Sequence, residues 1–325
     1  MSATRTMVLI AIALGLAAWG LPGPAAGQGA TSVRFGVDQF ILGAPVHVAV
    51  ERGIFQRNGV NAVVQPFPFG IDTIDGALAG RTDFGFALDF PLLIRLATRQ
   101  LRVVAAVIEP EPGFHKLAAR AGIAGPADLR GKRIAIAQGT AQHFVTLRYL
   151  QINGIDPSEA QLTPLPSLFE IVAALRRGSI DAAWVWAQGT DEAQQIPGVR
   201  ILTDDRAAQH QSYGYLAVGA AYLASRPEVV VAVLRSLAEA TDWMQANLPQ
   251  AAAIISKRNG APEARVLTEL RRQNAVVSLE RKHVTALSGL LDFMLANNIV
   301  RERIGVPDFF VIRPLQQAAP NRVRL

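Results

Sequence analysis

Apolar runs typical of strands alternate with segments of helical periodicity from residue 32 onward. Strands are predicted at 32–37, 61–67, 82–88 and 101–110, with helices at 44–55 and 71–80 between them. The run LRVVAAVIEP at 101–110 is apolar without a break, as expected for a strand buried on both faces. Strands separated by helices of about ten residues favour βαβ units and a parallel or mixed sheet.

Pro110, Pro112 and Gly113 interrupt this pattern, and a second α/β series follows. Its predicted strands are 115–121, 132–138, 160–166, 179–186, 199–205 and 213–220, and its helices are 140–155 and 168–177. Ser167 and Glu170 have the spacing of a capping box at the start of the second helix. After Ser225 the pattern predicts helices only, the first with a Ser225–Glu228 capping box, and a loose tail or surface strap at 315–325.

Two stretches share a layout of helix end, glycine, aspartate and small-residue strand. They are ALAGRTDFGFAL at 77–88 and ALRRGSIDAAWVW at 174–186. The echo predicts two similar α/β lobes. Because ligands of open α/β sheets bind beyond the carboxyl ends of strands, both strand ends are expected to face a shared cleft.

The first residues have the pattern of a secretory signal rather than of a domain. Arg5 precedes the apolar run MVLIAIALGLAAW, and small residues follow, with cleavage expected near Gly27. The apolar run is shorter than the about 20 residues that span a bilayer. An uncleaved N-terminal anchor is the alternative. Export to the periplasm is the expectation.

Removal of residues 1–27 leaves 298 of the 325 residues, which fits two domains. Half of the chain is hydrophobic and there is no cysteine, so neither domain depends on disulfides. Without Arg5 the chain has 31 basic and 26 acidic side chains, a net charge of +5. These charges are dispersed and no nucleic-acid motif accompanies them, so nucleic acid is not an expected partner.

Four segments in the order of the chain resemble a known family. They are HVAVERGIFQRNGVNAVVQPF, GALAGRTDFGFA, ADLRGKRIAIAQGTAQHF and LRRGSIDAAWVW, and the likeness spans about residues 33–205. They resemble the periplasmic solute-binding proteins of ABC importers for nitrate, taurine and alkanesulfonates. That family also includes binders of thiamine-precursor pyrimidines and of aromatic acids.

The resemblance implies a type II periplasmic-binding-protein fold, with two α/β lobes joined by two crossovers. Lobe 1 would comprise 31–112 plus 215–325, and lobe 2 would comprise 113–214. A monomer that closes over a small-molecule ligand and delivers it to an inner-membrane ABC permease is expected. No cofactor is expected.

The resemblance and the strand ends together predict the ligand-binding residues. They are Asp38, Gln39, Phe40, Gly70, Ile71, Leu88, Asp89, Thr140, Ala141, Gln142, His143, Trp186 and Gln188. The helix starts at Gly70 and Thr140 offer free amides to an anion, although a cap from the Thr140 side chain is the alternative. His143 could instead pack against the sheet.

Trp186 matches a family aromatic and is expected to line the cleft, whereas Trp184 is expected in the core, on the same strand face by alternation. The family often continues W-D-P, but this chain reads Trp186-Ala187-Gln188, so a carboxylate that can touch the ligand elsewhere is absent. The identity of the ligand therefore cannot be copied from a relative.

An enzyme is the main alternative, because the same fold includes a pyrimidine synthase of thiamine biosynthesis. That enzyme would need a cysteine-rich iron site, and no cysteine, G-x-S-x-G or P-loop motif is present. The histidines lack metal-ligand spacing, so no metal is predicted. A periplasmic sensor for a membrane receptor would use the same cleft and stays open.

The ligand's charge follows from the predicted strand ends. Asp38 and Asp89 are expected to face the cleft unless they cap neighbouring helices. A bare anion such as nitrate would then be repelled. A solute with an acidic end and an amine or other donor end, such as a taurine-like, amino-sulfonate or nitrogen-heterocyclic compound, would satisfy both.

Overall fold

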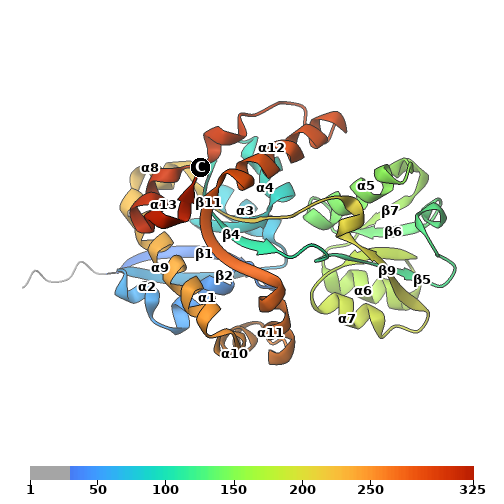
Figure 1. Cartoon of the computed structure of the whole chain (residues 1–325), viewed down its shortest axis with the longest axis horizontal. Coiled ribbons are helices and arrows are strands. Elements are labelled where there is room, and N and C mark those ends of the chain that lie inside the picture. Colours follow the sequence, from blue (N-terminus) through green and yellow to red (C-terminus); the bar gives the residue numbers. More distant parts are fainter. Residues whose placement is uncertain (1–29) are drawn as a thin grey trace, which may run out of the picture.

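The computed structural model describes residues 30–325, which form two α/β lobes lying side by side (Figure 1). We call the part built on a seven-stranded sheet lobe 1 and the part built on a five-stranded sheet lobe 2. The predicted signal segment and its cleavage site near Gly27 lie outside the described residues. Across residues 30–325, no helix has the length and apolar character needed to cross a membrane.

The lobe 1 sheet combines strands from both ends of the described chain. Its order is β12-β11-β4-β10-β3-β1-β2. The strands are β1 (Thr31–Asp38), β2 (Val60–Phe67), β3 (Phe84–Leu88), β4 (Leu101–Pro110), β10 (Gly214–Gly219), β11 (Gln273–Glu280) and β12 (Val323–Arg324). Strand β1 is parallel to β2 and β3, and β10 inserts antiparallel between β3 and β4. Strand β4 is buried along almost its whole length, which confirms its prediction as a two-sided buried strand.

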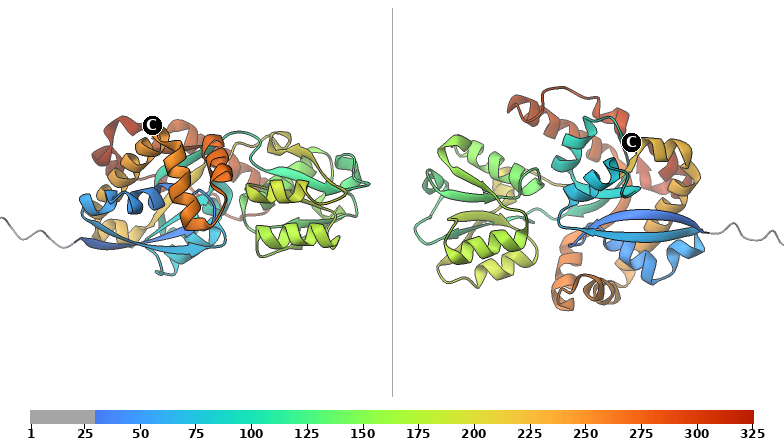
Figure 2. Two further views of the ribbon diagram at one scale, coloured as in Figure 1. Left: turned by 90° about the horizontal axis from the view of Figure 1, so that it is seen from below. Right: turned by 180° about the vertical axis from the view of Figure 1, so that it is seen from behind.

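Helices cover both faces of this sheet (Figure 2). They are α1 (Ala44–Glu51), α2 (Ile54–Arg57), α3 (Gly70–Leu78), α4 (Asp89–Leu96), α8 (Ala220–Ser225), α9 (Pro227–Ala246), α10 (Leu248–Asn259), α11 (Glu263–Arg272), α12 (Arg281–Ala296) and α13 (Ile312–Ala318). The first predicted helix is therefore two, because Gly53 adopts a φ of 65° between α1 and α2.

Lobe 2 contains only residues between β4 and β10. Its sheet has the order β7-β6-β8-β5-β9. The elements are β5 (Lys116–Arg120), β6 (Arg133–Ile136), β7 (Gln161–Pro164), β8 (Ala182–Val185), β9 (Val199–Asp204), α5 (Ala141–Ile152), α6 (Leu168–Arg177) and α7 (Gln188–Gln194). The chain passes between the lobes twice, from β4 to β5 and from β9 to β10 (Figure 1). The predicted fold class is confirmed.

The internal echo corresponds to one ion pair repeated in each lobe. Asp83 accepts hydrogen bonds from the Arg34 amide and guanidinium, and that guanidinium also donates to the Gly80 carbonyl. In lobe 2, Asp181 does the same for Arg133, which also donates to the Gly178 carbonyl. Arg133 lowers the pKa of Asp181. In each lobe the aspartate and its arginine therefore link two parallel strands to the end of a helix. The repeated aspartate has a structural role.

The prediction of helices only after Ser225 is wrong. Strand β11 follows α11 directly and pairs antiparallel with β4, and β12 extends the sheet beside it. The C-terminal residues are therefore a strap that ends in a strand. The Ser225 capping box is also wrong, because Ser225 ends α8 and Arg226 precedes Pro227, the first residue of α9. Ser167 does cap α6, accepting a hydrogen bond from the Glu170 amide at 3.1 Å.

Candidate functional site

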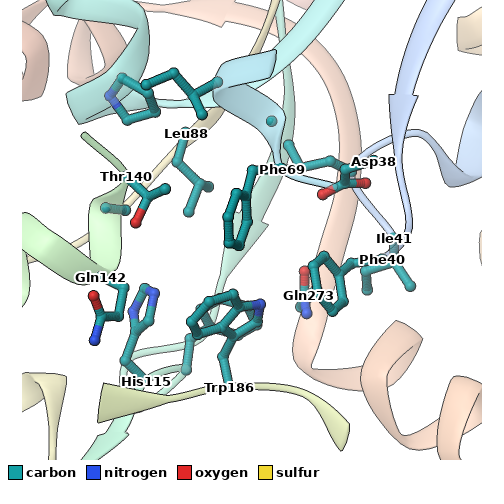
Figure 3. Close-up of a pocket in the computed structure, with 16 residues that line it drawn as sticks. Asp38, Phe40, Ile41, Phe69, Leu88, His115, Thr140, Gln142, Trp186 and Gln273 are labelled. Carbon is teal, nitrogen blue, oxygen red and sulfur yellow. The ribbon is translucent and has the colours of Figure 1, made fainter. Parts of the chain in front are cut away.

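A pocket lies between the lobes, where the predicted strand ends and helix starts meet (Figure 3). The empty space among its atoms is about 580 Å³, which includes solvent at its open mouth. Its lining comprises Asp38, Phe40, Ile41, Leu42, Phe69, Gly70, Ile71, Leu88, Pro91, Phe114, His115, Thr140, Ala141, Gln142, Trp186 and Gln273. Most of these side chains are apolar or aromatic.

Three aromatic rings face one another across the pocket. The ring of Trp186, from lobe 2, lies 5.8 Å from that of Phe40 and 6.2 Å from that of Phe69, both from lobe 1. His115 lies 5.9 Å from Trp186 on the lobe 2 side. Flat or aliphatic groups of a ligand could pack against these rings, and a positive charge would be attracted to their faces.

Trp184 and Trp186 have different surroundings. Trp184 is 1% exposed and packs against Tyr149 of α5, at 5.3 Å between ring centres. Trp186 lies beyond the end of β8 and packs with the cluster on the opposite face, which includes Ala183 and Val185. The expectation that both rings share a face is therefore wrong. Strict alternation ends with the strand at Val185, and Ala187 then adopts a φ of 45°.

Asp38 ends β1 and is the acidic side chain in the pocket lining. It is 4% exposed, and within residues 30–325 no group hydrogen-bonds to its Oδ1 atom. Burial raises the pKa of Asp38 to about 7, although the nearby backbone amides of Phe40, Gly43 and Leu42 oppose this rise. A buried acceptor without a partner is costly, so a ligand donor placed at this oxygen would be strongly favoured.

The N-terminus of α5 is open toward the pocket. Thr140 is the N-cap residue, but its hydroxyl donates to the Ala137 carbonyl at 2.7 Å and makes no cap hydrogen bond. The Gln142 side chain accepts from the Ala137 amide and donates to the Ala135 and Trp184 carbonyls. Gln142 therefore holds the ends of two strands together. The first-turn amides of α5 remain oriented for an acidic group of a ligand.

The N-terminus of α3 already has its own acid. Asp72 in its first turn accepts a hydrogen bond from the Phe69 amide at 3.0 Å. Gly70 is required here for a steric reason, since a Cβ atom would lie 2.9 Å from the Phe86 carbonyl oxygen. The α5 terminus is consequently the stronger site for a ligand anion.

Four predicted site residues do not line this pocket: Gln39, Asp89, His143 and Gln188. The chain turns into α4 directly after Leu88, so Asp89 is 1% exposed and its Oδ2 lies 3.1 Å from His210 Nε2. Asp89 also accepts from the Phe90 amide. The expectation that Asp89 faces the cleft is wrong.

The other three are placed by local contacts. His143 Nδ1 accepts from the Gly139 amide at 3.3 Å, and its ring packs edge-on against Phe90. Gln188 begins α7, and its side chain accepts from Arg265 at 3.4 Å. Gln39 is exposed beyond the end of β1.

Sequence reasoning missed Ile41, Leu42, Phe69, Pro91, Phe114, His115 and Gln273. Phe69 and Ile41 are direct neighbours of predicted residues. His115 had no visible signal, because its partner Asp205 is 90 positions away along the chain. Gln273 was missed together with β11, which it begins.

His115 is held by Asp205. Its Nδ1 atom lies 3.2 Å from Asp205 Oδ2, and the amides of Gly113 and His115 donate to the same carboxylate at 2.5 and 2.9 Å. Burial would raise the pKa of Asp205, but these hydrogen bonds outweigh it and lower the pKa. Of the described residues that line the pocket, none is a lysine or arginine. The pocket therefore offers no fixed positive side chain to a bare anion.

The lobes also contact each other beside the pocket. On one side, Phe144 of α5 packs edge-on against Phe293 of α12, at 5.0 Å between ring centres. On another, Arg265 Nε of α11 lies 3.2 Å from Asp191 Oδ2 of α7. The structure therefore has the lobes packed together around the pocket. Within residues 30–325 there is no cluster of three side chains suited to a metal ion.

Two α/β lobes joined by two crossovers, with a pocket between them, are the architecture of the periplasmic-binding-protein fold. The chain belongs to the NMT1/THI5-like family, whose model matches residues 43–252. The taurine-binding periplasmic protein of Escherichia coli (strain K12) is 26% identical over 233 residues, covering 68% of this chain and 72% of that protein. These relationships confirm the family resemblance predicted from the four segments.

Solved structures share the fold. The alkanesulfonate-binding protein SsuA from Xanthomonas axonopodis pv. citri, bound to MOPS, superposes with a TM-score of 0.74 at 21% identity, covering 88% of this chain and all of that one. The desulfurization enzyme DszB also superposes, with a TM-score of 0.65 at 15% identity, over 89% of this chain and 99% of the enzyme chain. The fold thus occurs in binding proteins and in at least one enzyme.

Proposed function

We propose that this protein is the solute-binding component of an ABC importer. It is exported to the periplasm, with cleavage near Gly27, and acts as a monomer. It captures one small organic solute between its lobes and presents the closed form to a permease, without chemical conversion. The observation that carries the proposal is the interlobe pocket, with its aromatic walls and the unpartnered carboxyl oxygen of Asp38.

The polar groups of the pocket favour a solute with two different ends. The Asp38 carboxyl can accept a hydrogen bond from an amine or another N–H donor of the solute, whereas the α5 amides can donate to an acidic group. A bare anion near the ionised form of Asp38 would be repelled by roughly 4 kcal/mol at 4 Å and an effective dielectric of 20. Amino-sulfonates such as taurine and amino-substituted ring acids fit these demands, and nitrate does not.

Binding is favoured over catalysis by the bonding of the polar side chains in the pocket. The Thr140 hydroxyl donates its proton to the Ala137 carbonyl, which cannot act as a general base, and the Gln142 amide is bonded to backbone groups. His115 has no serine or cysteine beside it in the lining. The pyrimidine-synthase alternative lacks its cysteines.

A thermal-shift panel of matched compounds tests the solute class. We expect taurine to raise the unfolding temperature more than ethanesulfonate, and 4-aminobenzoate more than benzoate, because only the first of each pair can donate to Asp38. Nitrate and sulfate at equal ionic strength are the controls for nonspecific salt effects. Greater stabilisation by the donor-free member of each pair would contradict the proposed site.

A further inference from the structure

Gln273 lies in the pocket beside Asp38 and Phe40 (Figure 3). It is the first residue of β11 and pairs with Pro110, at the point where β4 leaves lobe 1. Its side chain is 4% exposed, so its amide group must be satisfied by neighbours or by a ligand. β11 thus places a polar group of lobe 1 in a wall that is otherwise largely apolar.

The orientation of the Gln273 amide is determined by a partly buried acid, Glu269. Its Nε2 atom donates to Glu269 Oε2 at 2.9 Å, from the last turn of α11. With the nitrogen held there, the amide oxygen is the end that remains for the pocket. In Figure 3 this oxygen lies on the side of the amide nearer to Asp38. No hydrogen bond to this oxygen occurs among the described residues.

We infer that Gln273 is a second hydrogen-bond acceptor for the solute beside Asp38, and that Glu269 positions it. This inference rests on the proposed function. Two acceptors on one side of the pocket require two N–H bonds from one end of the solute. A primary ammonium or a ring amino group has them, whereas a dimethylated nitrogen does not. Gln273 therefore selects primary over substituted amines.

The matching of acceptor and donor has an energetic reason. A dimethylamino group would leave the Gln273 oxygen or the Asp38 oxygen buried without a donor, and buried unpaired acceptors are strongly disfavoured. The added methyl groups would also have to fit beside the ring of Phe40, which lines the same side. The discrimination thus comes from the unpaired polar group as well as from size.

The test compares Gln273→Met, which keeps the length but removes the amide, with wild type by calorimetry. The ligands are taurine and N,N-dimethyltaurine, and 4-aminobenzoate and 4-(dimethylamino)benzoate. Wild type is expected to prefer the primary amine by tenfold or more in at least one pair. Gln273→Met is expected to reduce that preference to less than about threefold. Gln56→Met, an exposed glutamine of α2, is the matched control and should keep the wild-type preference.

Glu269→Gln tests the positioning role. The new amide can donate as well as accept, so Gln273 is no longer held in one orientation. The preference for the primary amine should then fall between those of wild type and Gln273→Met. An unchanged preference in Glu269→Gln would show that Glu269 does not orient Gln273.

The outcomes separate the inference from the proposed function. If primary amines bind wild type and Gln273→Met keeps the full preference, Gln273 is not an acceptor for the solute and only this inference is overturned. If neither amine of either pair binds wild type, the amine site at Asp38 is wrong, and the role of Gln273 falls with it. Circular dichroism checks that Gln273→Met folds. If it does not fold, Gln273→Leu, which also removes the amide, is measured in its place.

Discussion

Replacement of Asp38 by asparagine is expected to weaken the binding of an amine-bearing solute about 100-fold. Removal of one partner of a buried, hydrogen-bonded charge pair typically costs 2–5 kcal/mol of binding free energy. A 100-fold loss is about 2.7 kcal/mol, which lies within that range. The comparison ligand is the donor-free member of the same pair, whose affinity should change little or improve. Titration calorimetry at pH 8 measures both. Equal losses for the amine and its donor-free partner would show that Asp38 acts only on the fold.

Asp89→Asn is the matched control for Asp38→Asn. Both carboxyls are almost fully buried, but Asp89 is directed toward His210 and away from the pocket. We expect its solute affinity to stay within about threefold of wild type. A 100-fold loss in Asp89→Asn would instead mean that the buried acids act on binding through the fold.

The pH dependence of Asp38→Asn follows from the raised pKa of the native carboxyl. Burial raises the folded pKa to about 7 from 3.8. The stability linked to the protonated carboxyl is therefore fully present below pH 3.8 and is lost as pH rises to 7. The free energy of unfolding of ligand-free Asp38→Asn, relative to that of wild type, should therefore be higher at pH 8 than at pH 5. The expected increase is on the order of 2 kcal/mol. Urea denaturation at both pH values measures this difference. A constant difference would contradict the raised pKa.

The same carboxyl gives solute binding a pH dependence of known sign. An ammonium group binds the ionised form of Asp38, which is the minor form in the ligand-free protein below pH 7. Affinity for the amine should therefore rise up to about pH 8 and fall as the solution becomes more acid. Asp38→Asn removes this dependence.

The second large effect concerns the two neighbouring tryptophans. Trp184→Ala is expected to reduce the free energy of unfolding by about 3–5 kcal/mol, as large core truncations do, because the ring is 1% exposed and packed against Tyr149. Trp186→Ala should instead weaken solute binding about tenfold and reduce stability less than Trp184→Ala does, since part of its ring forms a pocket wall.

Chemical denaturation and calorimetry on the two variants separate these effects. Trp243→Ala is the control, because that ring lies on α9 under the guanidinium of Arg52, outside the pocket lining. It should leave affinity unchanged. A reversed pattern, with binding lost in Trp184→Ala and stability lost in Trp186→Ala, would mean that the roles of the two rings are exchanged.

Much of the architecture was accessible from the sequence because its signals are local. Apolar runs, glycines after helices and the repeated Gly-Asp layout predicted the strands up to residue 220 and most of the helices, but not α4 or α7. Strand β11 was not predictable in this way. No glycine or proline separates it from α11 or α12, and its stability comes from pairing with β4, about 165 residues earlier. The secondary structure of such a segment is determined by its tertiary contacts and not by its local propensity.

The residues of the candidate site were likewise predicted only where a local sequence signal marks them. Segments at strand ends and helix starts gave Asp38, Phe40, Gly70, Thr140 and Trp186, because the fold places these positions at the interlobe edge. Position alone could not separate Asp38 from Asp89. That difference depends on the turn into α4 directly after Leu88, which directs the Asp89 carboxyl away from the pocket.

The most direct test of the binding function is recovery of the solute itself. Residues 28–325 are incubated for several hours with the most stabilising amine of the panel, passed through a desalting column and denatured, and the released small molecule is quantified by mass spectrometry. The expected result is about one molecule per chain, recovered with unchanged mass from wild type and absent from Asp38→Asn. Recovery of a chemically altered product, or equal recovery from Asp38→Asn, would contradict a solute-binding protein with its site at Asp38.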